Sequence, residues 1–437
     1  MARVYKDSGV NWIDIIPADW EVIRLKNIFS FGKGLPITKE NLTETGIPVI
    51  SYGQIHGKYN SGVRIHEELI RYVPEFYLSS NAESLVHEGD LILADTSEDL
   101  EGCGNCAYID HDGEIFAGYH TIILKSASPK NNKYIAYLMQ TDPWRSQIRS
   151  KVFGVKVLSV SRRIISDATL LLPPEDEQYR IADFLDKKCA EIDSVITETK
   201  RTIEEYKALR KATITKAITK GVRNKREMKD SGSVWFGDIP ADWNMMRLKY
   251  MFHIKKDIAG QEGYTVLSIT QKGIIPKNIA NNEGQLAADY SKYQLVEPGD
   301  FAMNHMDLLT GWVDISKYDG VTSPDYRVFV LDDEANNKEY YLYMMQMCYF
   351  NRIFYGLGQG VSGMGRWRLQ ADKFLNFYIA VPPVEEQNEI VDTLKKQLTE
   401  MDALIAAKEQ LLTEMEAYKK SVIYEYVTGK KEVPACQ

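Results

Sequence analysis

"KDSGVNWIDIIPADW" at residues 6–20 returns almost unchanged as "KDSGSVWFGDIPADW" at residues 229–243, with ten of the fifteen positions identical. Neither copy has the period of a helix or a strand, so local structure alone does not explain why the stretch recurs. The chain is therefore built twice. We expect an internal repeat to organise both its fold and its function.

A second repeated motif lies at the far end of each copy. "LLLPPEDEQYRI" at residues 170–181 corresponds to "IAVPPVEEQNEI" at residues 379–390, and each motif opens a long helical pattern. The double proline ends the preceding strand, and the acidic residues after it favour the positive N-terminus of a helix. The repeat therefore predicts the order globule, long helix, globule, long helix.

Two shorter matches predict an α/β globule between these motifs. "HEGDLILAD" at residues 87–95 and "VEPGDFAMNH" at residues 296–305 each predict a strand that follows a Gly-Asp turn. "KYIAYLMQ" at residues 133–140 and "EYYLYMMQ" at residues 339–346 each predict an amphipathic helix.

The two long helices each carry an apolar seam with alternating spacings of three and four. The seam of the second helix comprises Leu394, Leu398, Met401, Leu404, Lys408, Leu411, Met415, Tyr418 and Val422. The weaker seam of the first comprises Leu185, Cys189, Ile192, Val195, Thr199, Thr202, Tyr206, Leu209 and Thr213, beside Ile196, Ile203, Ile214 and Ile218. Gly221 and Gly429 close helices of about 65 Å each. We expect an antiparallel coiled coil; helices splayed on separate domains are the alternative.

The composition is that of a folded protein with more than one core. Of the 437 residues, 44% are hydrophobic and 26% charged, and a chain of this length is expected to form two or three domains. No apolar run approaches the roughly 20 residues of a membrane helix, and no secretory signal is visible. The five cysteines have no counterparts across the repeat. We therefore expect a cytoplasmic protein with reduced thiols and no membrane contact.

The net charge of −8 disfavours a protein that coats nucleic acid without selectivity. Locally, however, residues 143–166 hold six basic groups and no acid, and residues 340–371 hold three arginines and no acid. The two stretches occupy corresponding places in the repeat. They suit surfaces that face phosphates, although a solvated basic face on each globule would have the same composition.

Motifs of enzyme chemistry are missing from the sequence. It contains no G-x-x-x-x-G-K-[ST] phosphate loop and no [NDS]-P-P-[YFW] tetrapeptide of amino-methyltransferases. "GQGVSG" at residues 358–363 lacks the strand and helix that a dinucleotide-binding loop requires, so we interpret it as a plain loop. Cys103 and Cys106 have no further ligands at zinc spacing. No nucleophile or metal constellation includes the histidines His56, His66, His87, His120 and His305. We expect no catalytic activity, cofactor or metal.

Together these motifs resemble the DNA specificity subunit of type I restriction-modification systems. The resemblance is carried by two IP-x-x-W motifs with Arg-Leu-Lys shortly after them, the Gly-Asp strands, and two PP-x-x-EQ motifs ahead of long helices. It spans essentially the whole chain. It implies that each globule is a target recognition domain for one half of a bipartite, asymmetric DNA sequence, and that the helix pair sets the gap between half-sites.

The resemblance also implies partners. These are double-stranded DNA, two methyltransferase subunits that bring S-adenosylmethionine and methylate adenine, and two restriction or motor subunits that complete an ATP-dependent endonuclease. The specificity subunit itself would be non-catalytic. The alternative is a dumbbell scaffold or adaptor that holds protein partners and does not contact DNA.

The expected fold is an α/β (α+β) dumbbell with a pseudo-twofold internal repeat. The expected segments are a first target recognition domain at residues 1–174, a first spacer helix at 175–222, a second target recognition domain at 223–383, a second spacer helix at 384–430 and a tail at 431–437. The globules differ most at their centres, where "SYGQIHGKYNSG" starts at residue 51 and "SITQKGIIPKN" starts at residue 268. Two readers of different DNA sequences would differ in this way, as would surface loops that have drifted.

Candidate DNA-contacting residues are polar or basic side chains in the loops that the repeat aligns, because such groups bind base edges or phosphates. In the first globule they are Ser51, Tyr52, Gln54, Lys58, Thr96, Ser97, Lys156, Ser159, Ser161 and Arg162. In the second they are Ser268, Thr270, Gln271, Lys272, Asn304, His305, Gln359, Ser362, Arg366 and Arg368. A plain surface role is the alternative for each. Expected packing anchors are Pro17, Trp20, Pro240 and Trp243.

The end of the first long helix is basic, since residues 200–226 hold ten basic groups against two acids. We expect this stretch either to contact the DNA backbone or to be a solvated helix end whose cations favour the C-terminal dipole. Neutralising Lys216, Lys220, Arg223 and Lys225 would separate these interpretations.

Overall fold

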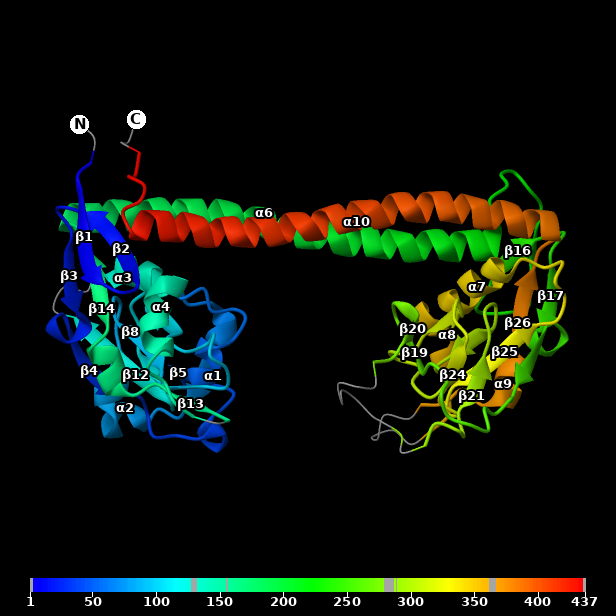
Figure 1. Ribbon diagram of the computed structural model, residues 1–437, viewed down its shortest axis with the longest axis horizontal. Coiled ribbons are helices and arrows are strands. Elements are labelled where there is room, and N and C mark those ends of the chain that lie inside the picture. The colour runs from blue at the N-terminus through cyan, green and yellow to red at the C-terminus, as the bar shows by residue number, and fades with distance from the viewer. Residues whose placement is uncertain are drawn as a thin grey trace. The chain divides into compact units, whose positions relative to one another are not determined.

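The computed structural model describes residues 3–126, 132–154, 156–278, 287, 289–360 and 367–434. The chain divides into two compact units: unit 1 contains residues 1–199 and 411–437, and unit 2 contains residues 200–410. Two long helices, α6 (Glu175–Lys220) and α10 (Val384–Val427), each contribute to both units (Figure 1). Each unit is therefore a mixed α/β globule that holds the start of one long helix and the end of the other.

Unit 1 is built around two four-stranded sheets. Its strands are β1 (Tyr5–Val10), β2 (Ile13–Pro17), β3 (Glu21–Arg24), β4 (Phe29–Lys33), β5 (Ile47–Ile50), β6 (Arg71–Val73), β7 (Leu85–Val86), β8 (Leu91–Ala94), β9 (Thr96–Ser97), β10 (Cys106–Tyr108), β11 (Ile115–Ala117), β12 (Thr121–Ser126), β13 (Leu158–Ser159) and β14 (Thr169–Leu172). Its shorter helices are α1 (Tyr52–Ile55), α2 (Tyr77–Ser80), α3 (Asn132–Met139), α4 (Asp142–Arg149) and α5 (Arg162–Ser166). The main sheet is antiparallel with the order β10-β8-β12-β4; the second has the order β6-β5-β11-β7, with β5 and β11 parallel.

Unit 2 repeats the main sheet. Its strands are β15 (Met228–Asp230), β16 (Asp238–Pro240), β17 (Asn244–Arg247), β18 (Phe252–Lys255), β19 (Leu267–Thr270), β20 (Gly273–Pro276), β21 (Gln294–Val296), β22 (Phe301–Met303), β23 (Val313–Ile315), β24 (Gly320–Thr322), β25 (Arg327–Leu331) and β26 (Tyr378–Val381). Its shorter helices are α7 (Lys338–Phe350), α8 (Ile353–Gly356) and α9 (Ala371–Leu375). The sheet β23-β22-β25-β18 has the strand order of the main sheet of unit 1, whereas two-stranded pairs, β19-β20 and β21-β24, take the place of the second sheet.

The elements predicted from the shorter matches are confirmed. The Gly-Asp strands are β8 and β22, and the predicted helices are α3 and α7, although α3 has no exposed face and is therefore not amphipathic. Each Gly-Asp turn is closed by its own carboxylate: Asp90 accepts a hydrogen bond from the backbone N–H of His87 at 3.0 Å, and Asp300 accepts one from Glu297 at 2.9 Å.

The repeated opening stretch forms a hairpin in each unit, which its pattern did not predict. β1 pairs antiparallel with β2, and β15 pairs antiparallel with β16. Most side chains of β1 and all those of β15 are exposed. A hairpin at the surface does not need the alternation of apolar and polar residues that marks a half-buried strand, so periodicity fails to identify it.

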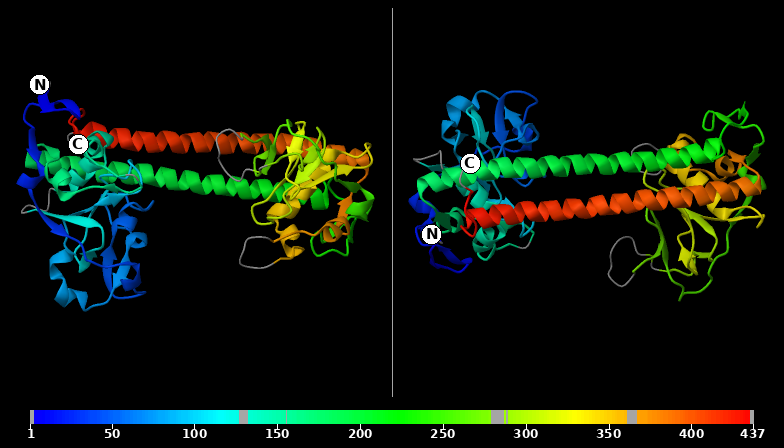
Figure 2. Two further views of the ribbon diagram at one scale, coloured as in Figure 1. Left: turned by 60° about the horizontal axis from the view of Figure 1, so that its bottom comes forward. Right: turned by 90° about the horizontal axis from the view of Figure 1, so that it is seen from above.

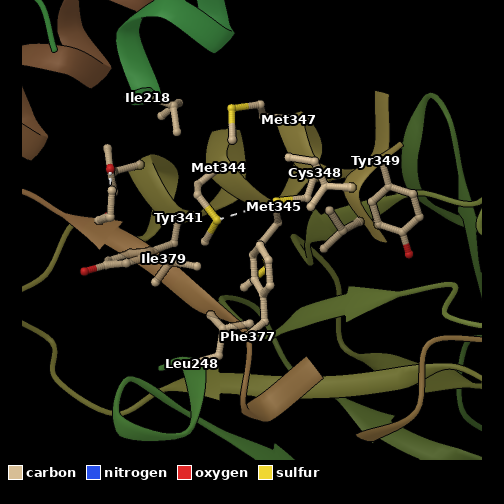
Figure 3. Close-up of a cluster of buried hydrophobic side chains, with 14 of the residues drawn as sticks. Ile218, Leu248, Tyr341, Met344, Met345, Met347, Cys348, Tyr349, Phe377 and Ile379 are labelled. Carbon is tan, nitrogen blue, oxygen red and sulfur yellow. Dashed lines mark hydrogen bonds between the residues drawn. The ribbon is translucent and has the colours of Figure 1, made fainter. Parts of the chain in front are cut away.

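The core of unit 2 joins the globule to its long helix. The α7 side chains Met344, Met345 and Met347 are buried between Ile218 of α6 and the globule residue Phe377 (Figure 3). Unit 1 has the same arrangement, because Leu185 of α6 and Val427 of α10 belong to one cluster with the globule core. The long helices are therefore part of each globule's core at their ends.

The two repeated motifs of unit 1 form a single junction. Trp20 of IP-x-x-W is fully buried, and its Nε1 donates to Oε2 of Glu177 at 3.0 Å. Arg3 donates to the same carboxylate at 2.8 Å. Gln178 donates to the carbonyl of Pro173 at 2.9 Å, so the EQ pair ties the helix start both to the tryptophan and to the prolines.

Unit 2 has the same junction. Trp243 is fully buried and donates to Oε2 of Glu386 at 2.9 Å, and Nη2 of Arg226 donates to that oxygen at 3.0 Å. Gln387 donates to the carbonyl of Pro382 at 3.0 Å. The predicted role of Trp20 and Trp243 as packing anchors is confirmed. Their hydrogen bonds to a glutamate more than a hundred residues away were not predicted, because no local pattern reports them.

The glycines that end the long helices pack against the IP-x-x-W motifs. Both have a positive φ, +72° at Gly221 and +70° at Gly429. A residue in this left-handed conformation commonly ends a helix, and glycine adopts it without a steric penalty. A Cβ at Gly429 would lie 2.5 Å from Pro17, and one at Gly221 would lie 3.2 Å from Trp243. Glycine is therefore needed at both positions for conformation and for space.

Within each unit, the start of one long helix lies beside the end of the other (Figure 2). In unit 1, Lys419 of α10 binds Asp193 of α6 at 2.7 Å. In unit 2, Arg210 of α6 binds Asp402 of α10 at 2.9 Å. The two helix stretches run antiparallel in each unit.

Most positions of the predicted seams are buried or half-buried, but four of them lie one position away from the buried stripe. Leu394, Leu398 and Val422 are buried, whereas Leu404 and Tyr418 are about half exposed, at 46% and 48%. Val195 and Leu209 of the first seam are also exposed. Away from the globules a helix has only one neighbour and buries a narrow stripe, so an apolar residue one position off that stripe stays in water.

Candidate nucleic-acid interface

Three candidate segments of unit 1 meet beyond the end of β8. β9, which holds Thr96 and Ser97, pairs with β13, which ends at Ser159. The carbonyl of Thr96 accepts a hydrogen bond from Nε2 of His56 at 2.8 Å. This bond connects β9 to the segment that follows β5. The fold therefore places the loop from residue 51, the turn after the Gly-Asp strand and the basic loop next to one another.

A hollow of about 690 Å³ opens between the first two of these segments, the loop from residue 51 and the turn after the Gly-Asp strand. Tyr52, Gln54 and Ser97 line it, together with residues that the sequence did not single out. One of these is Asn105, whose side-chain amide lies 3.1 Å from Nδ1 of His56. Because Nε2 of His56 faces a carbonyl, it carries the proton and Nδ1 accepts from Asn105.

The same hollow carries an acidic wall. Glu98, Asp99 and Glu101 line it directly after the candidate residues Thr96 and Ser97. Carboxylates repel phosphate but accept hydrogen bonds from amino groups such as N4 of cytosine. Lys39 and Arg145 line the same hollow, so its lining carries charges of both signs.

An aromatic and imidazole cluster borders the hollow. The ring of Tyr52 lies 5.5 Å from that of Tyr119 and 5.4 Å from that of His120. His120 has a positive φ of 56°, and its Nδ1 lies 3.1 Å from Oδ1 of Asp95. Neither His56 nor His120 was predicted as a site residue, because the partners of both come from distant strands.

Three candidate serines of unit 1 have structural partners. Ser51 and Ser97 are buried, at 1% and 2% exposure. The hydroxyl of Ser97 donates to the carbonyl of Asp99 at 2.7 Å, and that of Ser161 caps α5 by accepting from the backbone N–H of Ile164. Buried positions and local hydrogen bonds of this kind stabilise the conformation of the loops.

The basic stretch at residues 143–166 divides into two groups. Arg145 donates to the carbonyl of Met139 at 2.9 Å, and Arg149 binds Asp142 at 3.1 Å, so both are engaged within the unit. The exposed basic residues are Lys151, Lys156, Arg162 and Arg163, and the candidate Ser159 is exposed beside them. The guanidinium of Arg162 lies over the ring of Phe31 at 5.4 Å. The candidate Lys58 lies 4.8 Å from the ring of Tyr59.

In unit 2 the first candidate segment is the β19-β20 hairpin. Thr270 donates to the carbonyl of Gly273 at 3.0 Å and accepts from the backbone N–H of Lys272 at 3.1 Å. Gln271 is exposed and donates to the carbonyl of Thr310 at 3.2 Å. The turn therefore holds Thr270 in place and presents Lys272 to solvent.

The second candidate segment follows β22. Asn304 accepts from the backbone N–H groups of Met306 and Asp307 at 3.2 and 3.3 Å, which orders the turn. Asn304 and Ser268 line a hollow of about 480 Å³. His305 is partly buried beside Arg327 and Arg368; burial, together with these two cations, lowers its pKa to about 4. The imidazole is neutral near pH 7.

The third candidate segment approaches the second. Gln359 and Arg368 exchange backbone hydrogen bonds at 2.8 and 2.9 Å, and the carbonyl of His305 accepts from the backbone N–H of Leu369 at 3.0 Å. The fold thus brings His305, Gln359 and Arg368 together. The candidates Ser362 and Arg366 lie outside the described residues.

The basic end of α6 and the residues after it make several contacts within unit 2. Arg223 donates to both oxygens of Glu389 at 2.8 and 2.7 Å, and this contact lowers the pKa of the Glu389 carboxyl. Lys220 donates to the carbonyl of Asp238. Two of the four residues expected to distinguish DNA contact from a solvated helix end are therefore bound within unit 2. Lys216, Arg223 and Lys225 are exposed, and Lys220 is half-buried.

Metal or thiol chemistry would require clustered metal-ligating side chains or a reactive thiol. No group of three or more His, Cys, Asp or Glu side chains in the described part of the chain could hold a metal ion. Cys103 and Cys106 are buried, and burial raises the pKa of Cys106 to about 11, which keeps its thiol protonated. Within the described ranges, no helix is long and apolar enough to cross a membrane.

Comparison with known proteins identifies the repeat. The model of the type I restriction modification DNA specificity domain matches residues 17–205 and again residues 240–414. The chain is 25% identical, over 96% of its length and 94% of the relative, to a type I restriction enzyme MjaVIII specificity subunit of Methanocaldococcus jannaschii. It is 23% identical, over 99% of both chains, to a putative type I restriction enzyme MjaX specificity subunit of the same organism.

Solved structures share the fold. A chain from a study of complex assembly and conformational transition of the type I restriction-modification system superposes with a TM-score of 0.67, covering 95% of this chain and 99% of that chain at 15% identity. The HsdS subunit of Thermoanaerobacter tengcongensis gives a TM-score of 0.50, covering 95% and 98% at 16% identity. With two matched domains that together span most of its length, the chain belongs to the family of type I restriction modification DNA specificity proteins.

Proposed function

We propose that this chain is the sequence-specific DNA recognition subunit of a type I restriction-modification complex, and that each unit reads one half of a bipartite, asymmetric site. The observation that carries the proposal is the double family match, with one copy of the DNA specificity domain at residues 17–205 and the other at 240–414. The differing centres of the two units support a different half-site for each.

In unit 1 we assign phosphate and base contacts to the exposed basic loop and to half-buried residues at the hollow. Lys156 and Arg162 lie in the basic loop and suit phosphates or guanine edges. Tyr52 and His120 supply the aromatic and imidazole border, and Gln54 suits an adenine edge.

In unit 2 we assign the contacts to two neighbouring surfaces. Gln271 and Lys272 extend from the β19-β20 hairpin into solvent. Gln359 and Arg368 belong to the bridged segment beside His305. The neutral imidazole and the arginine guanidinium offer acceptor and donor groups to a base edge.

We further propose that α6 and α10 pair as a coiled-coil spacer between two target recognition domains, with boundaries at residues 174, 222, 383 and 430 and a tail at 431–437. The antiparallel contacts within each unit, Asp193 with Lys419 and Arg210 with Asp402, support this arrangement. The proposed partners are double-stranded DNA, two methyltransferase subunits and two restriction or motor subunits, in the cytoplasm. The chain itself is proposed to be non-catalytic, and the family match does not favour the adaptor alternative.

The test is to co-express the chain with a cognate methyltransferase subunit in a host free of DNA methylation and to map modified adenines by long-read sequencing. We expect a single split motif with a fixed gap. The absence of modified adenines, despite a stable complex of the two proteins, would contradict the proposal and favour a scaffold that does not read DNA.

A further inference from the structure

The two junctions affect which gap between half-sites the protein accepts; this inference rests on the proposed function. We propose that the Trp–Glu–Arg junctions, Trp20, Glu177 and Arg3 in unit 1 and Trp243, Glu386 and Arg226 in unit 2, hold each globule at a fixed angle on its long helix. Holding that angle restricts the gap accepted between half-sites. The six residues are positioning residues, since they act through the globule and do not touch the bases.

The junction of unit 2 is buried and fully bonded. Glu386 has no exposed surface, and its carboxylate accepts from Trp243 at 2.9 Å and from Arg226 at 3.0 Å. The guanidinium of Arg226 also lies over the Trp243 ring at 5.8 Å and binds Asp242 at 2.5 Å. Every charged or polar group of the junction therefore has a partner in one geometry.

The junction of unit 1 repeats this geometry with slightly more exposure. The side chains of Arg3 and Glu177 are 13% and 12% exposed and lie 2.8 Å apart. Arg3 lies over the Trp20 ring at 5.4 Å. Two globules with different centres share the three residues, the Trp-to-Glu and Arg-to-Glu hydrogen bonds and the position of the guanidinium over the ring, which indicates a requirement common to both.

The covalent path from globule to helix runs through the junction. In unit 1, β14 leads through Pro173 into α6, and it pairs with β3, which directly follows Trp20. In unit 2, β26 leads through Pro382 into α10 and pairs with β17, which directly follows Trp243. Turning the globule on its helix must separate the tryptophan from the glutamate in the first helical turn. Separation would leave a buried carboxylate without its donors, which is strongly unfavourable.

DNA makes the angle as important as the distance. Changing the gap by one base pair moves a half-site by about 3.4 Å along the axis and turns it by roughly 35°. A globule that can turn on its helix could follow such a change. One that is held by a buried, fully bonded carboxylate could not.

The experiment uses the full chain in its complex with the methyltransferase subunit. The substrates carry both half-sites with gaps one or two base pairs shorter or longer than the natural one. The variants are Trp243→Phe, which removes the indole donor, Glu386→Gln, which removes the charge, and Trp20→Phe in unit 1. We expect methylation at the neighbouring gaps to rise at least tenfold relative to the natural gap, while the bases required in each half stay the same.

A control variant separates positioning from stability. Met344→Ala opens a cavity in the buried α7 face of unit 2 but leaves the junction intact. It should lower the melting temperature and keep the single gap. Equal relaxation by Met344→Ala, or a single gap retained by all three junction variants, would overturn the inference. A complex with the wild-type chain that methylates no split site would instead overturn the proposed function.

Discussion

Unit 1 and unit 2 agree where they meet the long helices and differ where they would meet DNA. The main sheet has the same strand order in both, and the Trp–Glu–Arg junction has the same contacts. At the centre, the short helix α1 of unit 1 corresponds to the β19-β20 hairpin of unit 2. At the end of the Gly-Asp strand, Asp95 corresponds to His305. The two units therefore share the main sheet and the junction, whereas the candidate DNA-contacting surface of each is its own.

One contact between globule and helix is retained with its charges reversed. In unit 1, Lys133 of α3 binds Asp186 of α6. At the equivalent place in unit 2, Glu339 of α7 binds Lys395 of α10 at 2.5 Å. The contact persists although both partners have changed sign, so attachment of the globule to the helix matters in both units.

The largest expected effect tests whether the two junctions are equivalent. Trp20→Ala and Trp243→Ala each empty a fully buried site, and each should cost about 3–5 kcal/mol of the free energy of unfolding. Calorimetry of the single variants measures it. Trp235→Ala is the control, because this hairpin tryptophan is 40% exposed. A loss at Trp20 or Trp243 no larger than the control's would break the comparison.

The next effect separates the two surfaces. Lys156→Ala with Arg162→Ala should weaken DNA binding of the assembled complex roughly tenfold and flatten its salt dependence by about one for each phosphate that the variant no longer neutralises. Base preference should relax only in the half-site of unit 1, whereas Arg368→Ala should relax the other half. Lys396→Ala, on α10, is the exposed control. Relaxation of both halves by either variant would contradict separate readers.

A smaller effect should appear in acid and should depend on unit 2. The folded-state pKa of His305 is about 4, below the usual value of 6.5, so the folded protein resists a proton that the unfolded chain binds. This contribution to stability is complete above pH 6.5 and is lost as pH falls toward 4. Allowing for screening of the partly exposed ring, the loss at pH 5 should be about 1 kcal/mol. His305→Gln should lose less stability than wild type between pH 7 and pH 5; parallel profiles would refute this.

The smallest effect concerns the reversed ion pair. Lys133→Glu should destabilise unit 1 by about 1 kcal/mol or less, because the pair is only partly buried. Adding Asp186→Lys should restore most of that stability by recreating the arrangement of unit 2. Thermal melts of the single and double variants give the coupling between the two residues. Additive losses would show that the contact does not depend on charge.

Much of the frame could be predicted because its signals are local. The double prolines, the acidic first turns and the closing glycines indicate both long helices, and the Gly-Asp turns indicate β8 and β22. The junction could not be predicted, because Trp20 and Glu177 lie in different motifs and meet only in the folded unit. The seam is one position off at Leu404 and Tyr418, because spacings of three and four fit two adjacent stripes there.

The candidate surface was predicted less completely than the frame. Aligned loops identified segments that the fold does bring together, such as Thr96 with Ser159. They did not distinguish the buried Ser51 and Ser97 from exposed neighbours, since burial depends on tertiary packing. They also did not identify Asn105 and His120, whose contacts come from other strands.

The central claim, that each unit reads its own half of the site, is tested most directly by a chimera. Residues 229–383 would be replaced by the corresponding segment of another family member with a known split motif, and modified adenines would be mapped in the presence of the methyltransferase subunit. The account predicts that one half of the motif changes to that of the donor while the other half and the gap stay the same. A change in both halves, or in neither, would contradict it.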